Sequence, residues 1–177
     1  MHRLLPFLKR RGYSITRDTT IIRDFIQVDC VLPGGRGDIV HVYLSTLPPD
    51  QTVGKKTISN LISYSSPSTV SHVILICAKI SRQSIHMFRT YRYFELLSMD
   101  DLFIERFDHK YVPRYERLSK EEIVKVCQKY GDCTKFPRII AKTDAVARML
   151  GFRRGDVLVA YIKCPYRGNI VEYRYVV

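Results

Sequence analysis

The 177-residue sequence lacks any hydrophobic segment long enough to cross a membrane as a helix. An uninterrupted apolar run such as VILICA, at 73–78, is short, whereas a membrane helix needs about 20 apolar residues. The start, MHRLLPFLKRR, has some features of a secretion signal, but Pro6 interrupts its apolar part and basic residues follow at once. We therefore expect no membrane partner, and we predict an amphipathic first helix.

The sequence also lacks the cysteine and histidine spacing of a metal site. Its five cysteines are odd in number and widely spaced, and no Cys-x-x-Cys motif occurs. No nearby cysteine or histidine pair completes a zinc site with Cys127 and Cys133. We predict reduced, mostly buried thiols, which indicate an intracellular protein, and we expect neither a metal nor another cofactor.

Catalytic motifs are missing as well. Gly54-Lys55-Lys56-Thr57 resembles the end of a phosphate-binding loop, but proline stands at position 49, where that loop needs glycine. The Arg-Gly-Asp triplets at 36–38 and 154–156 are typical of turns. A metal-dependent nuclease would need a carboxylate near Lys79, and no histidine stands in a recognisable nucleophile motif. The sequence therefore predicts a protein without catalytic residues of its own.

Acidic residues are scarce relative to basic ones. The sequence has 29 Lys and Arg against 17 Asp and Glu, which gives a net charge of +12. The charge is uneven: residues 1–108 carry 14 basic and 10 acidic side chains, whereas residues 109–177 carry 15 and 7. Such a balance favours a polyanionic partner, nucleic acid among the candidates.

The hydrophobic pattern predicts two domains, residues 1–108 and 109–177. In the first, short apolar or alternating segments favour strands and one segment has helical spacing. The expected strands are 15–32, 39–45, 72–79 and a segment near 102–107, and the expected helices are 58–64 and part of 81–101. We predict an α/β fold for this first domain.

The second domain has clear helix signals. Ser119 and Glu122 form a capping-box pattern that predicts a helix over 120–130, ended by Gly131. A shorter helix over 144–150 would be capped by Thr143 or Asp144. DVLVAYIK and NIVEYRYVV predict a terminal hairpin, and the domain as a whole is predicted to be small and α+β.

Short motifs occur in fixed order in this second domain. They are His109-x-x-Val112-Pro113, Phe136-Pro137-Arg138-Ile139, Asp144-Ala-Val-Ala, Gly151-x-x-x-Gly155-Asp156-Val157, and Gly168 followed by Tyr173-Arg174. In these motifs the segment resembles the assembly domain that forms a small subunit of archaeal RNA polymerase. The same domain ends the fifth-largest subunit shared by the three eukaryotic nuclear RNA polymerases. The first domain resembles the eukaryotic subunit at Gly12-Tyr13-x-Ile15, 53–58 and 73–76, and the archaeal subunit lacks this domain.

The resemblance implies a non-catalytic subunit of a DNA-directed RNA polymerase. Its second domain would dock on the largest subunit, and its jaw-like first domain would help to form the lower jaw around downstream duplex DNA. The residues that would serve the subunit interface or the fold are His109, Val112, Pro113, Pro137, Arg138, Ile139, Asp144, Gly151, Gly155, Gly168, Tyr173 and Arg174. The residues that would approach the DNA backbone are Lys79, Ser81, Arg82 and Ser84.

Departures from the family pattern indicate a divergent copy, such as one encoded by a large DNA virus of eukaryotes. Ala145 stands where the family has proline, and Phe136 where it has leucine. A cellular copy would act in the nucleus, and a viral one in the host cytoplasm or nucleus and in the virion. Two alternatives stay open: a free-standing basic DNA-binding regulator, and a nuclease-like module in residues 1–108.

Overall fold

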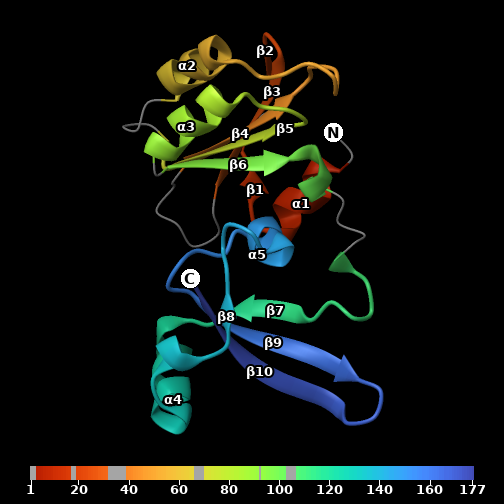
Figure 1. Cartoon of the computed structure of the whole chain (residues 1–177), viewed down its shortest axis with the longest axis vertical. Coiled ribbons are helices and arrows are strands. Elements are labelled where there is room, and N and C mark those ends of the chain that lie inside the picture. The colour runs from red at the N-terminus through yellow and green to blue at the C-terminus, as the bar shows by residue number, and fades with distance from the viewer. Residues whose placement is uncertain (1–2, 17–18, 32–38, 66–69, 92, 103–106) are drawn as a thin grey trace. The chain divides into compact units, whose positions relative to one another are not determined.

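The computed structural model describes residues 3–16, 19–31, 39–65, 70–91, 93–102 and 107–177. The chain divides into two compact units, residues 1–103 and 104–177 (Figure 1). The first unit mixes helices with a mixed parallel and antiparallel sheet, and the second is a small α+β unit. The predicted combination of fold classes is therefore confirmed.

The first unit is built on a mixed six-stranded sheet in which β4, β5 and β6 run parallel. At the other edge, β3 pairs antiparallel with β4 and carries the two short strands β1 and β2. The strands are β1 (Ser14–Ile15), β2 (Thr20–Ile22), β3 (Phe25–Val31), β4 (Ile39–Ser45), β5 (His72–Cys77) and β6 (Phe94–Ser98).

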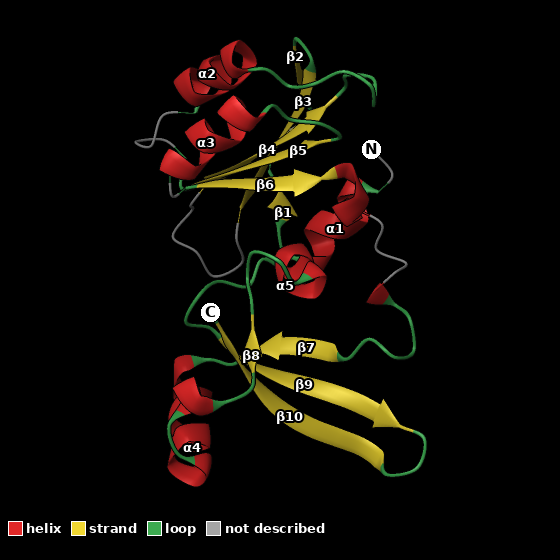
Figure 2. Cartoon of the chain, in the orientation of Figure 1, coloured by secondary structure: helices red, strands yellow, loops and turns green. Residues whose placement is uncertain are grey.

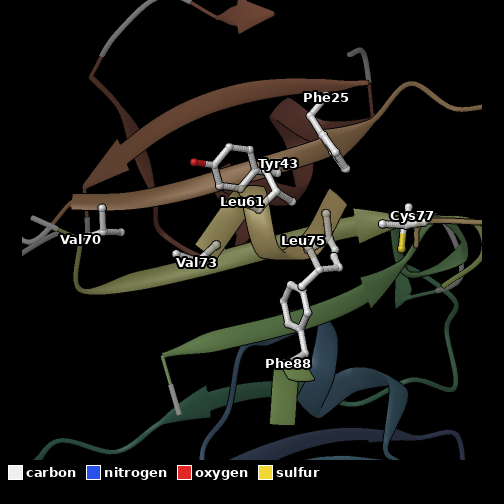
Figure 3. Close-up of a cluster of buried hydrophobic side chains, with 10 residues drawn as sticks. Phe25, Tyr43, Leu61, Val70, Val73, Leu75, Cys77 and Phe88 are labelled. Atoms are coloured by element: carbon white, nitrogen blue, oxygen red, sulfur yellow. The ribbon is translucent and has the colours of Figure 1, made fainter. Parts of the chain in front are cut away.

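Helices cover both faces of this sheet (Figure 2). They are α1 (Leu4–Arg10), α2 (Lys55–Tyr64) and α3 (Arg82–Thr90). Because successive side chains of a strand point to opposite faces, Val73 and Leu75 of β5 face α2 and α3. They share a buried cluster there with Leu61 and Phe88 (Figure 3). Ile74 of β5 is buried on the other face, where α1 lies. Burial on both faces explains why β5 is continuously apolar.

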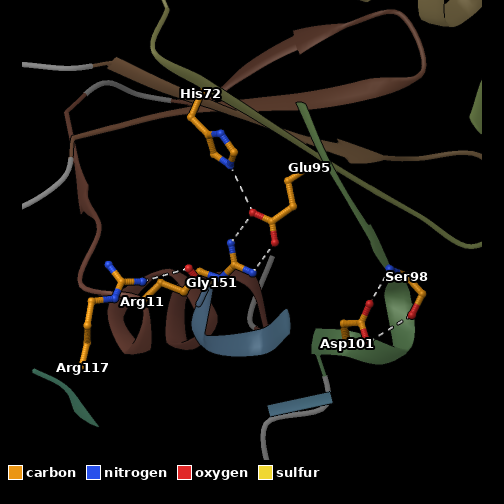
Figure 4. Close-up of polar contacts among 7 residues, drawn as sticks. All are labelled: Arg11, His72, Glu95, Ser98, Asp101, Arg117 and Gly151. Carbon is orange, nitrogen blue, oxygen red and sulfur yellow. Dashed lines mark hydrogen bonds and ion pairs between the residues drawn. The ribbon is translucent and has the colours of Figure 1, made fainter. Parts of the chain in front are cut away.

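The last strand of the first unit lies earlier than predicted. The prediction of a strand near 102–107 is wrong for Leu102, which belongs to the 3-10 helix η1 (Met99–Leu102). Residues 103–106 lie outside the described residues. A reciprocal turn ends β6: the Ser98 amide donates to Asp101 Oδ2 at 2.7 Å, and the Asp101 amide donates to Ser98 Oγ at 3.3 Å (Figure 4).

The second unit is a four-stranded sheet in the order β7-β9-β10-β8. The predicted hairpin is confirmed as β9 (Val157–Cys164) and β10 (Gly168–Val176), and the remaining strands are β7 (Arg114–Arg117) and β8 (Arg138–Ile139). The helices are α4 (Lys120–Tyr130), η3 (Cys133–Lys135) and α5 (Ala145–Leu150). The Ser119 capping box is present, and Asp144, one of the two predicted caps, caps α5 by accepting from the Ala147 amide at 2.9 Å.

The prediction of reduced cysteines is wrong for Cys127 and Cys133, which form a disulfide. Gly131, at φ 85°, turns the chain directly after α4 and brings the two Cα atoms to 5.6 Å. The prediction holds for Cys30 and Cys77, which are free and buried, and burial raises the pKa of each thiol to about 11. Because disulfides are rare inside cells, the cysteines no longer support an intracellular location.

Candidate functional site

The turn after β5, which was predicted to approach DNA, is tied to the start of α2. The Val53 amide donates to the Lys79 carbonyl at 3.0 Å, and the Ser81 amide donates to the Val53 carbonyl at 3.1 Å. Ser81 then caps α3 by accepting from the Ser84 amide at 3.2 Å. Lys79 and Arg82 are exposed on this ordered turn, so their cationic groups can reach an external anion.

Ser84 lies inside the turn, unlike Lys79 and Arg82. Its side chain is fully buried, with its hydroxyl 2.7 Å from Ser81 Oγ and 3.3 Å from the Val53 carbonyl, to which it donates. A direct contact between Ser84 and DNA would require this turn to open. We therefore assign Ser84 the role of holding the turn.

Several motif residues of the second unit shape the chain. Gly155 has φ 94° at the entry to β9, and its amide donates to the Val176 carbonyl at 2.9 Å. Gly151 ends α5 in the left-handed region at φ 67°, and Gly168 opens β10 at φ 72°. Side chains other than glycine rarely adopt such angles, so these motif glycines are explained by the fold.

Other motif residues belong to the packed interior or to its edge. Ile139 of β8 is buried in a cluster with Leu158 and Val176. The Tyr173 ring stacks on Phe136 at a centroid distance of 5.8 Å. Val112, Pro113 and Arg174 are half-buried, and Arg174 donates to Glu172 at 2.7 Å. These residues join the sheet to η3 and the surrounding loops.

Besides the turn glycines Gly155 and Gly168, three motif residues are exposed on the surface: His109, Pro137 and Arg138. Two exposed apolar side chains that sequence reasoning did not select stand beside them, Tyr111 at 69% and Ile140 at 53% exposure. Their position next to motif residues was the signal that could have identified them. The His109 segment precedes β7 and the Pro137–Arg138 segment includes β8, so the two lie at opposite edges of the sheet. In each segment an exposed apolar side chain next to exposed motif residues suits contact with another protein.

Arg117 also escaped the sequence analysis. It donates to the Gly151 carbonyl at 3.0 Å (Figure 4). It also forms an ion pair with Asp156 at 3.0 Å. Asp156 in turn accepts from the Arg153 amide at 2.7 Å. Arg117 therefore fastens β7 to the turn between α5 and β9, a role that depends on residues far away in the sequence.

A buried ionic group holds the first unit together. The Arg11 guanidinium, 1% exposed, makes two hydrogen bonds to the Glu95 carboxylate at 2.7 and 2.8 Å, and His72 Nε2 lies 3.1 Å from the same carboxylate (Figure 4). Burial alone would raise the pKa of Glu95, but the bonds to Arg11 and His72 lower this pKa from 4.5 to about 2. The group joins the end of α1 to β5 and β6.

Neither unit shows a metal centre within its described residues, where no three or more His, Cys, Asp or Glu side chains lie together as metal ligands would. No helix in that part of the chain is long and apolar enough to cross a membrane. The candidate sites are the basic turn after β5 and the two exposed motif segments of the second unit, around His109 and around Arg138.

The two units and their motifs define a class of protein, the accessory subunits of multisubunit RNA polymerases. The family model "RNA polymerase Rpb5, C-terminal domain" matches residues 104–176. DNA-directed RNA polymerase subunit Rpo5 of Nitrosopumilus maritimus is 40% identical over 72 residues, which cover 40% of this chain and 84% of that protein. The Rpo5 of Sulfolobus acidocaldarius is 34% identical over 70 residues, 40% of this chain and 83% of that protein.

A plant relative extends the likeness into the first unit. DNA-directed RNA polymerase V subunit 5A of Arabidopsis thaliana is 24% identical across 95% of this chain and 80% of that protein. The chain belongs to the Rpb5 family of RNA polymerase subunits, whose archaeal members are called Rpo5. Because the family is non-catalytic, membership confirms the prediction that the chain is not itself an enzyme.

Proposed function

We propose that this chain is a jaw-forming accessory subunit of a DNA-directed RNA polymerase. Its second unit docks on the largest subunit, beside other polymerase subunits, and its first unit lies against the backbone of downstream duplex DNA. The observation that carries the proposal is that the family match, residues 104–176, coincides with one compact unit, 104–177. Such a subunit acts inside the cell, in the nucleus for a cellular polymerase.

The docking surface in this proposal comprises two exposed segments at opposite edges of the sheet, one around His109 ahead of β7 and one around Pro137 and Arg138 at β8. The neighbouring Tyr111 and Ile140 would lose contact with water on binding, which favours association. The motif residues Asp144, Gly151 and Gly155 act indirectly, because they shape the ends of α5 and the entry to β9.

The DNA surface in this proposal is the turn that carries Lys79, Ser81 and Arg82. Exposed cations neutralise phosphates, whereas base recognition needs side chains that reach a groove edge in a fixed geometry. On this turn the hydroxyl of Ser81 is bonded to Ser84, and Lys79 and Arg82 are long exposed side chains suited to phosphate contact. We therefore expect contacts that do not depend on the DNA sequence.

Co-precipitation with the largest polymerase subunit tests the docking. Arg138→Glu reverses a charge on the exposed segment at β8, and we expect it to weaken capture of the largest subunit without changing the unfolding temperature. Arg154→Glu, another exposed arginine of the same unit, is the matched control. Equal capture by both variants would remove Arg138 from the interface. A wild-type chain that binds specific DNA alone, without any polymerase subunit, would favour the free-standing regulator instead.

Salt challenge of assembled polymerase tests the DNA contact. Lys79→Ala combined with Arg82→Ala should leave assembly intact and lower the salt resistance of elongation complexes, because each lost phosphate contact reduces counterion release. The reduction should be similar on two unrelated downstream sequences. An unchanged salt resistance would show that the turn faces solvent, and a change on one template alone would show sequence recognition.

We further propose that the chain is a divergent copy of the subunit, such as one from a large DNA virus of eukaryotes. Ala145 and Phe136 support this, since both depart from the family pattern. In that case the protein would act in the host cytoplasm or nucleus and be packaged in the virion. A source genome that encodes this subunit beside virion proteins would support the idea, and a cellular genome with this as its sole copy would contradict it.

A further inference from the structure

The disulfide between Cys127 and Cys133 holds the end of α4 on the second unit. None of the eleven residues of α4, all of which are described, is buried, and Ile123 and Val126 are only half-buried. The main neighbour of α4 among the helices and strands is η3, to which Cys133 belongs. Since a short helix depends on tertiary packing for its stability, the covalent bond replaces packing that this helix lacks.

The two ends of α4 are held in different ways. At the start, the Leu118 amide donates to the Val157 carbonyl of β9 at 2.9 Å, and the Ser119 capping box closes the first turn. At the end, the Tyr130 ring lies 5.5 Å from the Tyr173 ring of β10, but Tyr130 remains exposed. Loss of the disulfide would therefore release the last turns of the helix and leave its first turn in place.

The Cys133 side of the disulfide is fixed by contacts other than the bond itself. The Asp132 carboxylate caps η3 by accepting from the amide and the hydroxyl of Thr134, at 2.9 and 2.8 Å. Cys133 is buried. After reduction Cys133 would therefore stay in position, with Cys127 only six residues away, so the same bond can form again.

Two of the three free cysteines are unable to exchange readily with this pair. Cys30 and Cys77 are buried in the first unit, and burial raises the pKa of each thiol to about 11. The thiolate, and not the thiol, attacks a disulfide, so these two side chains stay inert near neutral pH. The third, Cys164, is half-buried at the end of β9 and provides a control. The pair can therefore open and close without exchange to Cys30 or Cys77.

We propose that the Cys127–Cys133 pair is a redox-sensitive clasp, which fixes the end of α4 when oxidised and releases it when reduced. This inference rests on the proposed function, which places the chain inside the cell, where the disulfides that do occur are usually transient or redox-sensing. The clasp adds a response to the redox state that docking and DNA contact do not require.

The co-reactant is a small thiol of the glutathione class. Its thiolate attacks Sγ of Cys127, which is less buried than Cys133, and the S–S bond breaks. Cys133 leaves as a thiolate and takes up a proton. A second thiolate then attacks the small-thiol sulfur of the mixed disulfide, so that Cys127 is released and protonated. Two small thiols are thereby oxidised to one disulfide, and their two electrons reduce the protein pair.

Amide hydrogen exchange of the full chain in glutathione buffers tests the clasp. The ratio of reduced to oxidised glutathione is varied, and alkylation of the free thiols reports how much of the pair is open. On reduction we expect exchange at 124–130 to become roughly 30-fold faster, because the opened helix end gains the freedom that the closed loop denies it. Exchange in β9 and β10 should stay much slower than at 124–130. Cys127→Ser with Cys133→Ser should show the fast exchange in every buffer, and Cys164→Ser should respond as the wild type does.

Other patterns of exchange would overturn the inference. If 124–130 stays as protected as β9 and β10 after reduction, packing holds α4 and the disulfide is not a clasp. A pair that remains closed at the glutathione ratios found inside cells would be a structural bond and not a switch. Capture of the largest polymerase subunit by the same protein tests the proposed function separately. Failed capture with a normal response to glutathione would refute the docking alone, and normal capture by a chain that does not respond would refute the clasp alone.

Discussion

Replacement of Glu95 by glutamine should destabilise the first unit strongly at neutral pH. Glu95 is the common acceptor for Arg11 and His72, and the Arg11 side chain is only 1% exposed. The amide of glutamine is neutral, so the buried guanidinium would lose its counter-charge. Breaking a buried pair in this way is more damaging than replacing both partners by apolar groups, because the remaining charge is left desolvated.

The expected magnitude follows from the pKa of Glu95. This pKa falls from 4.5 to about 2 on folding, and each unit corresponds to about 1.4 kcal/mol, so the ionised carboxylate contributes roughly 3 kcal/mol to the free energy of unfolding. Since the folded pKa lies below the unfolded one, this contribution is present above about pH 4.5. It is lost progressively as the pH falls toward about 2.

Chemical denaturation followed by far-ultraviolet circular dichroism at several pH values measures the effect. We expect wild type and Glu95→Gln to differ by roughly 3 kcal/mol near pH 7, and the difference to shrink between about pH 4.5 and pH 2. Glu122 and Asp132, whose pKa values are also lowered, are present in both proteins and cancel in the difference.

Glu172→Gln is the matched control, because Glu172 pairs with Arg174 at the same 2.7 Å distance but is 41% exposed. Exposed pairs contribute about 0–1 kcal/mol, so this variant should be nearly neutral. A difference between wild type and Glu95→Gln that stays constant down to about pH 2 would refute the ionic explanation and indicate a packing effect. A loss in Glu172→Gln equal to that in Glu95→Gln would refute the importance of burial.

Three further predictions concern the second unit. Gly155→Val should cost about 1–2 kcal/mol, and Gly155→Asn less, because φ is 94° and no atom crowds the position; equal unfolding temperatures would contradict the backbone explanation. Cys127→Ser should lower the free energy of unfolding by about 2 kcal/mol, because the disulfide to Cys133 no longer closes its short loop. Reductant should then no longer change the stability, whereas Cys164→Ser, which leaves the disulfide intact, should keep the effect of reductant. Arg117→Ala should lower the free energy of unfolding by about 1–2 kcal/mol, because the bond to the Gly151 carbonyl is lost. Amide hydrogen exchange in β7 should become faster, and unchanged exchange would count against this role of Arg117.

Local chemistry explains which elements could be predicted from the sequence. The capping box at Ser119 and the stop at Gly131 involve neighbours in the chain, and both were predicted at the correct residues. By contrast, β7 has no periodic pattern and becomes a strand only because Arg114–Arg117 pair with β9, which lies far along the chain. The last strand of the first unit was predicted near 102–107 but lies at Phe94–Ser98, because its pairing with β5, and not its local pattern, defines β6.

In the candidate sites too, features that depend on neighbouring residues could be predicted and features that depend on distant contacts could not. The exposed cations of the turn after β5 were visible in the sequence, but the burial of Ser84 depends on a hydrogen bond to Val53, 31 positions away. The Arg11–Glu95 pair spans 84 positions, and no pattern in the sequence connects the two residues. Contacts of this kind follow from the three-dimensional fold and not from local propensity.

The motifs that carry the family resemblance are largely explained by backbone geometry, and this bears on where a partner can bind. Asp144 caps a helix, and Gly151, Gly155 and Gly168 hold angles that other residues avoid. These residues serve the local fold, so their presence alone identifies no contact surface. The residues that the fold leaves unexplained are the exposed ones, Arg138 foremost, because an exposed arginine at the start of a two-residue strand adds little to packing. A partner surface is therefore best sought where the resemblance persists but the fold gives no reason for it.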